Sequence, residues 1–364
     1  MQSQQLTELK IAKENNDTKK YWQLINDKRK KKRKHVTNLS ANQFKDGIVE
    51  NDKILTTANN LLIGIDDFRC FPRQNYDDSL DMKVTKLEVM KALSSMKNSK
   101  SSGPDFVVYE IFKKNTKDTV DILTSLFNKV FVGNSIPWNE SWISPIFKKG
   151  DKNEITSYRH INLSSCLEKL MTKILNAGLN VWIEKYDLLH QSQSGFRKNN
   201  STIDNVWILK EIIKIYNNDK TPLYLCFMDL SKAFDSIPKH RLVYKLRKIL
   251  PDSKFTTVIQ SILEAKSYRV LHDGHESELF KLHNGIPQGD SLSPILYCLY
   301  INDLLTTLDQ HTSITDPIRI IDMEIASLIY ADDIVLLSQS KTGLVQQIKI
   351  TQQFFSYKWF TYQL

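Results

Sequence analysis

The sequence predicts an α+β protein built on an antiparallel sheet with helices packed against it. Two stretches lead to this prediction. Residues 327–338 form two apolar runs of strand length on either side of the adjacent Asp332 and Asp333, the pattern of a tight hairpin. Residues 223–228 form a third apolar run, and Asp229 follows it directly. Each of the three carboxylates therefore lies at the end of a predicted strand.

Three carboxylates at neighbouring strand ends favour a metal site. Adjacent carboxylates repel one another, which raises their pKa values unless a cation lies between them. Oxygen ligands suit Mg²⁺ or Mn²⁺, and three carboxylates from two strands suit a pair of ions about 4 Å apart. An Asp-Asp pair is also common in solvent-exposed turns, so the pattern alone leaves both interpretations open.

A further stretch, residues 285–294, is rich in glycine and proline and precedes a predicted apolar helix at 295–305. A loop of this composition leaves backbone amides free of secondary structure. The sequence therefore predicts that these amides and the side chain of Gln288 meet a ligand.

Three segments in this order and spacing resemble the reverse transcriptases of non-LTR (LINE-type) retrotransposons: FMDLSKAFDSIP (227–238), GIPQGDSLSPILYCLYINDL (285–304) and YADDIVLLS (330–338). The resemblance extends from about Val84 to the C-terminus. It implies a right-hand polymerase fold with fingers and palm, in which the strands that carry the three carboxylates are antiparallel neighbours in the palm sheet. It also implies an RNA-directed DNA polymerase that transfers nucleotides to a primer 3′-hydroxyl with two Mg²⁺ or Mn²⁺ ions. The implied partners are an RNA template, a DNA primer and deoxynucleoside triphosphates.

The resemblance also implies roles at the metal site. Asp229 and Asp332 would bridge both ions, and Asp333 would lie nearer the periphery. The backbone carbonyl of Leu230 would add a ligand. Tyr330 would pack beside the site, near the primer end.

Around the nucleotide, the resemblance implies that Gln288 and Gly289 line the pocket. Phe234 stands five residues after Asp229, at the family's sugar-gate position. An aromatic ring there would clash with a ribose 2′-hydroxyl and so favour deoxynucleotides. A phenylalanine that only fills the core is the alternative interpretation.

Two groups of basic and aromatic residues complete the implied contacts. Predicted strands at 142–147 and 158–163 form a fingers hairpin, and arginine suits fork-like phosphate contacts. The residues that this hairpin would carry toward the triphosphate are Lys148, Lys149 and Arg159. A bare hairpin tip is the alternative interpretation. The loop that would follow the template path contains Gly195, Phe196, Arg197 and Lys198.

The other elements follow from helical or strand spacing. Helices are predicted at 84–96, 119–132, 163–185, 202–216, 238–250, 255–265 and 344–355, and a hairpin at 268–282. The predicted packing face of the first helix is Val84, Leu87, Met90 and Leu93. That of the fourth is Ile203, Val206, Leu209 and Ile213. Residues 35–80 show few clear periods.

The expected domains are a linker or N-terminal extension at 1–80, fingers at 81–220 and palm at 221–364. In the family, an endonuclease precedes the polymerase and a helical thumb follows the palm. We expect both to be missing from this chain, so that it holds the catalytic architecture but supports little processive synthesis.

The formal net charge is +9, and much of it comes from the run Lys28 to Lys34. Without this run, 43 basic residues face 41 acidic ones, so any other nucleic-acid surface must arise from local clustering. The run itself is typical of a solvated arm, of a phosphate-binding segment or of a nuclear import signal, and these interpretations stay open.

The sequence also bears on location. No apolar run approaches 18 residues, so no membrane partner is expected, and the N-terminus lacks the apolar core of a secretory signal. We therefore expect an intracellular protein, nuclear or cytoplasmic.

Two other functions remain to be weighed. One is a maturase of the group II intron type, although LSKAFDSIP is closer to the non-LTR form. The other is an inactive nucleic-acid-binding remnant, against which the intact set of three carboxylates argues.

Overall fold

The computed structural model describes residues 37–60, 77–114, 116–133, 136–230, 232–250, 253–320 and 323–358. The basic run at 28–34 lies outside this part of the chain. The described residues form two compact units: residues 147–159 group with residues 37–40, and the other described residues from Ala41 onward form the second unit. Within the described residues, no helix combines the length and apolar character needed to cross a bilayer.

The helices are α3 (Ala41–Asn60), α4 (Lys86–Ser95), α5 (Tyr109–Lys114), α6 (Thr116–Gly133), α7 (Cys166–Lys185), α8 (Thr202–Asn218), α9 (Lys239–Ile249), α10 (Lys254–Glu264), α11 (Ser293–Asp309), α12 (Thr312–Thr315) and α13 (Lys341–Lys358). The strands are β1 (Glu140–Phe147), β2 (Tyr158–Leu163), β3 (Tyr224–Asp229), β4 (Ser267–His272), β5 (His275–Glu276), β6 (Phe280–Lys281), β7 (Ile318–Ile320), β8 (Met323–Ile325), β9 (Ser327–Tyr330) and β10 (Asp333–Ser338). Each helix predicted from spacing is present, and so is the α+β class.

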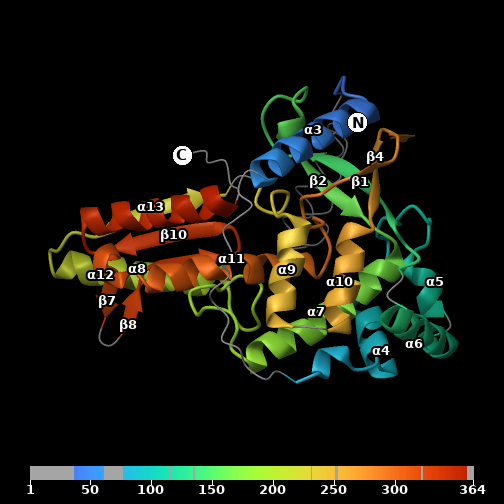
Figure 1. Ribbon diagram of the computed structural model, residues 1–364, viewed down its shortest axis with the longest axis horizontal. Helices are drawn as coiled ribbons and strands as arrows, with labels where there is room; N and C mark the ends of the chain where they lie inside the picture. Colours follow the sequence, from blue (N-terminus) through green and yellow to red (C-terminus); the bar gives the residue numbers. More distant parts are fainter. Residues whose placement is uncertain are drawn as a thin grey trace, which may run out of the picture. The chain divides into compact units, whose positions relative to one another are not determined.

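The carboxylate-bearing strands form one antiparallel sheet in the order β3-β10-β9, as predicted. Side chains alternate between its faces. One face, with Ile334 and Leu336, joins the main core beside α11 and α13. The other face, with Leu225 and Leu337, packs on α8. Figure 1 shows α13 running alongside β10.

Helix α11 is the central support of this sheet because it is buried on every side. Its residues from Ile295 to Leu305 are all buried. A helix that is apolar all round belongs in a core, which fits the run ILYCLYINDLL. The chain that leaves the Gln288 loop therefore enters the core at once, so the loop has a fixed end.

A second sheet has the order β2-β1-β4-β5, and β6 also pairs with β4. Strands β1 and β4 are parallel, with Glu140 opposite Ser267, whereas β5 and β6 are antiparallel to β4. The predicted hairpin at 268–282 is therefore present, but both of its return strands are only two residues long.

Two predicted packing faces were wrong in part. In α4 the buried residues are Val89, Ala92 and Leu93, while Leu87 and Met90 are exposed. Helix α4 itself begins as expected for its sequence, with a capping box between Thr85 and Glu88.

In α8 the buried residues are Ile212 and Tyr216, whereas Ile203 and Val206 are 74% and 65% exposed. Leu209 does pack against the core, as predicted. The helix carries apolar residues on two faces, and a period of 3.6 cannot tell which face meets the sheet.

Helix α3 lies within residues 35–80, for which the sequence predicted no helix. Its buried residues Phe44, Ile48 and Leu55 nevertheless recur at helical spacing, and Asp52 lies on the same face. The helix packs on β4, where the Phe44 and His272 rings meet edge to face at 4.8 Å (Figure 1). The region predicted as a linker thus contributes an ordered helix.

Candidate active site

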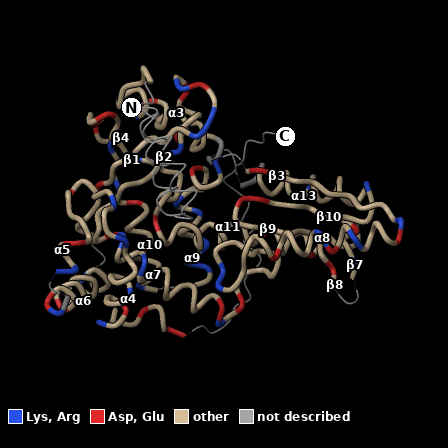
Figure 2. The backbone as a smooth tube through the Cα atoms, turned by 180° about the vertical axis from the view of Figure 1, so that it is seen from behind, with Lys and Arg blue, Asp and Glu red and all other residues tan. Residues whose placement is uncertain are grey.

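The predicted carboxylates meet at one edge of the β3-β10-β9 sheet. Asp229 ends β3 and Asp333 begins β10, and the two residues are directly opposite in the antiparallel register. Opposed residues point to the same face of a sheet, and both of these are exposed. Asp332 lies in the adjacent turn and is half-buried. Figure 2 shows the acidic positions in red at neighbouring ends of β3 and β10.

The turn before Asp332 is held by a neutral side chain. The amide oxygen of buried Gln193 accepts hydrogen bonds from the backbone N–H groups of Gly195, at 2.8 Å, and Ala331, at 3.0 Å. Ala331 has a φ of 59°, which is uncommon for a non-glycine residue, and the hydrogen bond from its N–H to Gln193 helps to hold this conformation. The sequence predicted this loop, Gln193 included, but gave no indication that the Gln193 side chain supports the turn. The only signal was an amide side chain two residues before a glycine.

Gly195 was predicted to bind nucleic acid, and the structure places it against the turn. A Cβ atom at this position would lie 2.3 Å from the backbone nitrogen of Ala331. The preceding residue, Ser194, donates its backbone N–H to the Ile329 carbonyl at 2.9 Å. The loop therefore lies along β9 like a short extra strand, and only glycine fits at its closest approach.

Some of the remaining residues of this loop are exposed, and others are hydrogen-bonded within the protein. Phe196 is exposed, and its ring centroid lies 6.3 Å from that of Tyr330. Lys198 is exposed as well. Arg197 instead forms two 3.0 Å hydrogen bonds to the Glu184 carboxylate, which raise the pKa of Arg197. Its third nitrogen donates to the carbonyls of residues 189 and 190, so the guanidinium is bound within the protein.

The predicted sugar gate rests on a buried ring. Phe234 is half-buried and stacks on Tyr297, with ring centroids 4.9 Å apart and planes at 18°. Tyr297 is fully buried, and burial together with the nearby carboxylates of Asp332 and Asp333 raises its pKa well above the ordinary value. One aromatic pair therefore joins the gate to the carboxylate turn.

The Gln288 loop is bonded to the same gate segment. The Gln288 side-chain nitrogen donates to the Asp235 carboxylate at 2.8 Å, and the Ile286 N–H donates to the Phe234 carbonyl at 3.0 Å. Burial raises the pKa of Asp235 to about 6, and the hydrogen bond from Gln288 opposes the rise. Asp235 does not cap helix α9, because the residue at that cap is Pro238.

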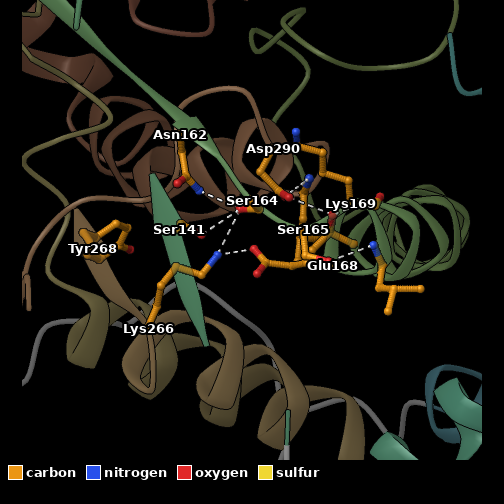
Figure 3. A network of polar contacts seen from close by, with 12 residues as sticks. Ser141, Asn162, Ser164, Ser165, Glu168, Lys169, Lys266, Tyr268 and Asp290 are labelled. Carbon is orange, nitrogen blue, oxygen red and sulfur yellow. Dashed lines mark hydrogen bonds and ion pairs between the residues drawn. The ribbon is translucent and has the colours of Figure 1, made fainter. Parts of the chain in front are cut away.

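A buried polar network supports the far side of the loop (Figure 3). The Gln288 carbonyl accepts from the Asn162 N–H at 2.9 Å, and the Asn162 side chain donates to the Ser164 hydroxyl at 2.9 Å. The Lys266 ammonium also contacts that hydroxyl, at 3.2 Å, and pairs with Glu168. Both side chains of this ion pair are 1% exposed. The network therefore links a buried ion pair to the loop backbone.

Lys148, Lys149 and Arg159 lie in the other compact unit. The hairpin predicted for them is present: the Lys148 N–H donates to the Ser157 carbonyl at 2.8 Å. Gly150 turns the chain with a φ of 99°. The role of the three basic residues toward a triphosphate stays a prediction.

The chemistry of the edge is that of an oxygen-rich site. Among the described residues, no three His, Cys, Asp or Glu side chains are gathered closely enough to hold an ion by themselves. Asp229 and Asp333 nevertheless offer two carboxylates from paired strands, and Asp332 offers a third beside them. Mg²⁺ usually takes one or two protein carboxylates and completes its shell with water and substrate phosphates. The donor set fits that mode of binding.

Comparison with known proteins adds a family and relatives. The model of a family described as reverse transcriptase (RNA-dependent DNA polymerase) matches residues 146–362. The chain is 29% identical over 298 residues to a probable RNA-directed DNA polymerase from transposon BS of Drosophila melanogaster, covering 78% of this chain and 32% of that protein. It is 26% identical over 264 residues to the RNA-directed DNA polymerase from mobile element jockey of the same species, covering 72% and 28%.

A third relative is the Pol polyprotein from a type-1 retrotransposable element R2 of Popillia japonica, 26% identical over 220 residues, with 60% of this chain and 30% of that protein covered. The chain thus spans about a third of the length of these relatives or less. Among solved structures, apo telomerase of Candida tropicalis truncated from its C-terminal domain matches with a TM-score of 0.42 and 16% identity, covering 69% of this chain and 52% of that one.

Proposed function

Because this chain belongs to the reverse transcriptase (RNA-dependent DNA polymerase) family, we propose that it extends a DNA primer by copying an RNA template. The observation that carries the proposal is the register of β3 and β10, which sets Asp229 opposite Asp333 with Asp332 beside them. The fold this implies is the fingers and palm of a right-hand polymerase. An upstream endonuclease and a downstream thumb stay predictions of the resemblance.

At the carboxylate edge, Asp229, Asp332 and the Leu230 carbonyl would hold two Mg²⁺ or Mn²⁺ ions, with Asp333 at the periphery. When bound, the ions would lower the pKa of the primer 3′-hydroxyl and neutralise charge on the phosphates. The protein's own contribution is to hold the carboxylates close together at the edge of the sheet. The bond from Gln193 to Ala331 supports this because it fixes the turn from which Asp332 and Asp333 project.

The nucleotide would lie against Phe234, Gln288 and Gly289. An ionised Asp235 can only accept hydrogen bonds, so it orients the Gln288 amide with its nitrogen inward. The amide oxygen then remains for a donor on the nucleotide. The stacked Tyr297 supports the proposed gate, because it prevents the Phe234 ring from sinking away from a 2′-hydroxyl.

The primer and template would lie beside the carboxylates, over the end of the sheet where Phe227, Asp229 and Asp333 are exposed. Phe227 points to the same face as Asp229, two residues earlier on β3, and is 68% exposed. Phe196 and Tyr330 lie next to the turn. Exposed rings stack on bases or pack on sugars, and Lys198 adds a positive charge for a phosphate. The predicted contact of Arg197 with nucleic acid would have to form beside its ion pair with Glu184.

The proposal is tested by single-nucleotide addition. The purified chain is given a DNA primer annealed to an RNA template, Mg²⁺ and one labelled deoxynucleotide at a time. We expect addition of the nucleotide complementary to the template, abolished by EDTA. Addition that ignores the template base, or no addition with either Mg²⁺ or Mn²⁺, would contradict it. One-step addition is the right readout because it does not require the chain to hold a long duplex.

A further inference from the structure

The backbone that leads into the Gln288 loop is bonded to helix α3. The Asp52 carboxylate, 6% exposed, accepts hydrogen bonds from the backbone N–H of His283 at 3.1 Å and of Asn284 at 2.9 Å. It also accepts from the Asn284 side-chain nitrogen at 2.9 Å, and that nitrogen donates to the Thr56 hydroxyl at 2.9 Å as well. Two residues on successive turns of α3 therefore hold the start of the loop.

A buried lysine holds the same segment. The Lys239 ammonium, 2% exposed, donates to the Leu282 carbonyl at 2.7 Å, and the Lys239 N–H donates to the His283 carbonyl at 3.3 Å. Burial lowers the pKa of Lys239 to about 7, and the negative charge of Asp52 counters that fall. An acid and a base thus bind consecutive peptide groups, and each makes the burial of the other less costly.

From this point the chain runs directly to the proposed nucleotide pocket. The Gly285 N–H donates to the Ile237 carbonyl at 2.7 Å, and only three residues separate Asn284 from Gln288. Gly285 and Gly289 have φ values of 86° and 98°, a left-handed conformation that glycine adopts without steric strain. Because neither residue has a side chain that packs, the shape of the loop depends on hydrogen bonds at its two ends.

The far side of the loop is tied down by Asp290. Its carboxylate accepts from the Thr172 hydroxyl at 2.7 Å and from the Leu292 N–H at 2.8 Å. The loop is therefore held by two carboxylates, Asp52 before Gly285 and Asp290 after Gly289. Asp290 belongs to the loop itself, whereas Asp52 comes from a helix more than 200 residues away in the sequence.

We infer that Asp52 is a positioning residue for nucleotide binding, through which helix α3 sets the position of Gln288 and Gly289. The inference rests on the proposed function only in taking this loop as part of the nucleotide pocket. It assigns a role in the reaction to a region that precedes residues 146–362, the part matched by the family model. Asp52 would touch neither the nucleotide nor the ions.

The test compares Asp52→Ala and Asp52→Asn with Lys45→Ala in the full chain. Lys45 is on the same helix and pairs with Glu278 at 3.0 Å, away from the loop. Asp52→Ala should raise the KM for the deoxynucleotide about tenfold, the order of effect of one hydrogen bond to a charged group. The KM for primer–template should not change. Asp52→Asn keeps one amide oxygen for the Asn284 donors, so its effect should be smaller.

Hydrogen exchange supplies a readout that does not depend on activity. In Asp52→Ala, backbone amides over 282–290 should exchange faster, while those of α7 and α11 keep wild-type protection. Lys45→Ala should match the wild type in both experiments. Wild-type nucleotide KM and loop exchange in Asp52→Ala would overturn the inference, as would equal loss of protection throughout the chain. If the wild type adds no nucleotide, the proposed function fails. Hydrogen exchange then tests the role of Asp52 separately: faster exchange in Asp52→Ala confined to 282–290 shows that Asp52 positions the loop, and unchanged exchange shows that it does not.

Discussion

The Asp332–Asp333 turn and the Gln288 loop belong to one candidate site, but their surroundings hold them differently. Neutral groups in close contact fix the turn: Gln193 binds its backbone, and Gly195 approaches so closely that no side chain fits. Buried charges fix the loop, through Asp52 on one side and the Glu168–Lys266 network on the other. Close packing at the turn tolerates almost no displacement, whereas the loop keeps its shape only through particular hydrogen bonds, so the loss of one bonding partner should loosen it.

The charged support should be the more costly to break. Glu168→Gln leaves the Lys266 ammonium buried without a counter-charge, which should lower the free energy of unfolding by about 3–5 kcal/mol. Urea unfolding measures this loss. The control is Asp121→Asn, which breaks the 2.6 Å pair with Lys86 at the surface and should cost less than about 1 kcal/mol. Equal small losses in both variants would mean that the buried pair is not a support.

Breaking the packed support should impair catalysis more than stability. In Gly195→Ala the new methyl group would displace the backbone at Ala331, and a shift of about 1 Å at a reacting group can lower the rate about 100-fold. Single-nucleotide addition measures the loss. Gly133→Ala is the control, because a Cβ at that position meets nothing within 4 Å. A wild-type rate in Gly195→Ala would show that the turn can move freely.

The gate links the two regions, and its removal should change selectivity. Phe234→Ala opens space above Tyr297, so kcat/KM for ribonucleotides relative to deoxynucleotides should rise about tenfold. The ratio cancels any general loss of activity. Phe280→Ala, the same chemical change on β6, should leave the ratio unaltered. An unchanged ratio in Phe234→Ala would mean that this ring only fills the core.

The smallest predicted effect concerns the acid that binds Gln288. The pKa of Asp235 is about 6 in the folded chain and near its ordinary value of about 4 when unfolded. The folded state therefore binds the proton more tightly, and this group's contribution to stability is present below pH 4 and is lost as the pH rises to about 6. Partial exposure limits that loss to about 1–2 kcal/mol.

Asp235→Asn should remove this pH dependence. As the pH rises from 4 to 6.5, the unfolding free energy of the wild type should fall relative to that of the variant. Asp273→Asn in the β4–β5 turn is the matched control, since that carboxylate is exposed. Parallel pH profiles for the wild type and Asp235→Asn would show that Asp235 titrates normally.

Much of the carboxylate edge could be predicted from the sequence, because its determinants are local. An apolar strand that ends in Asp229, and a hairpin around Asp332 and Asp333, specify their own pairing through the alternation of side chains. The packing faces of α4 and α8 could not be predicted in full. Both helices carry apolar residues on more than one face, and tertiary contacts decide which face is buried.

The supports of the site were missed for a different reason. Gln193 meets Ala331, and Asp52 meets Asn284, across 138 and 232 residues respectively. A buried amide or carboxylate has no local pattern of its own, so spacing along the chain does not reveal its partner. Spacing along the chain likewise did not reveal the pairing of Arg197 with Glu184, and the predicted contact of Arg197 with nucleic acid stays a prediction.

The most direct test of the central claim is the effect of removing one carboxylate at a time on single-nucleotide addition. Asp229→Asn and Asp332→Asn remove a charge with almost no change in shape, and Asp273→Asn is the same substitution at a distant turn. We predict that the first two abolish template-directed addition with Mg²⁺ while their urea unfolding matches that of the wild type, and that Asp273→Asn adds nucleotide at the wild-type rate. Mg²⁺-dependent addition at the wild-type rate by Asp332→Asn would contradict the account.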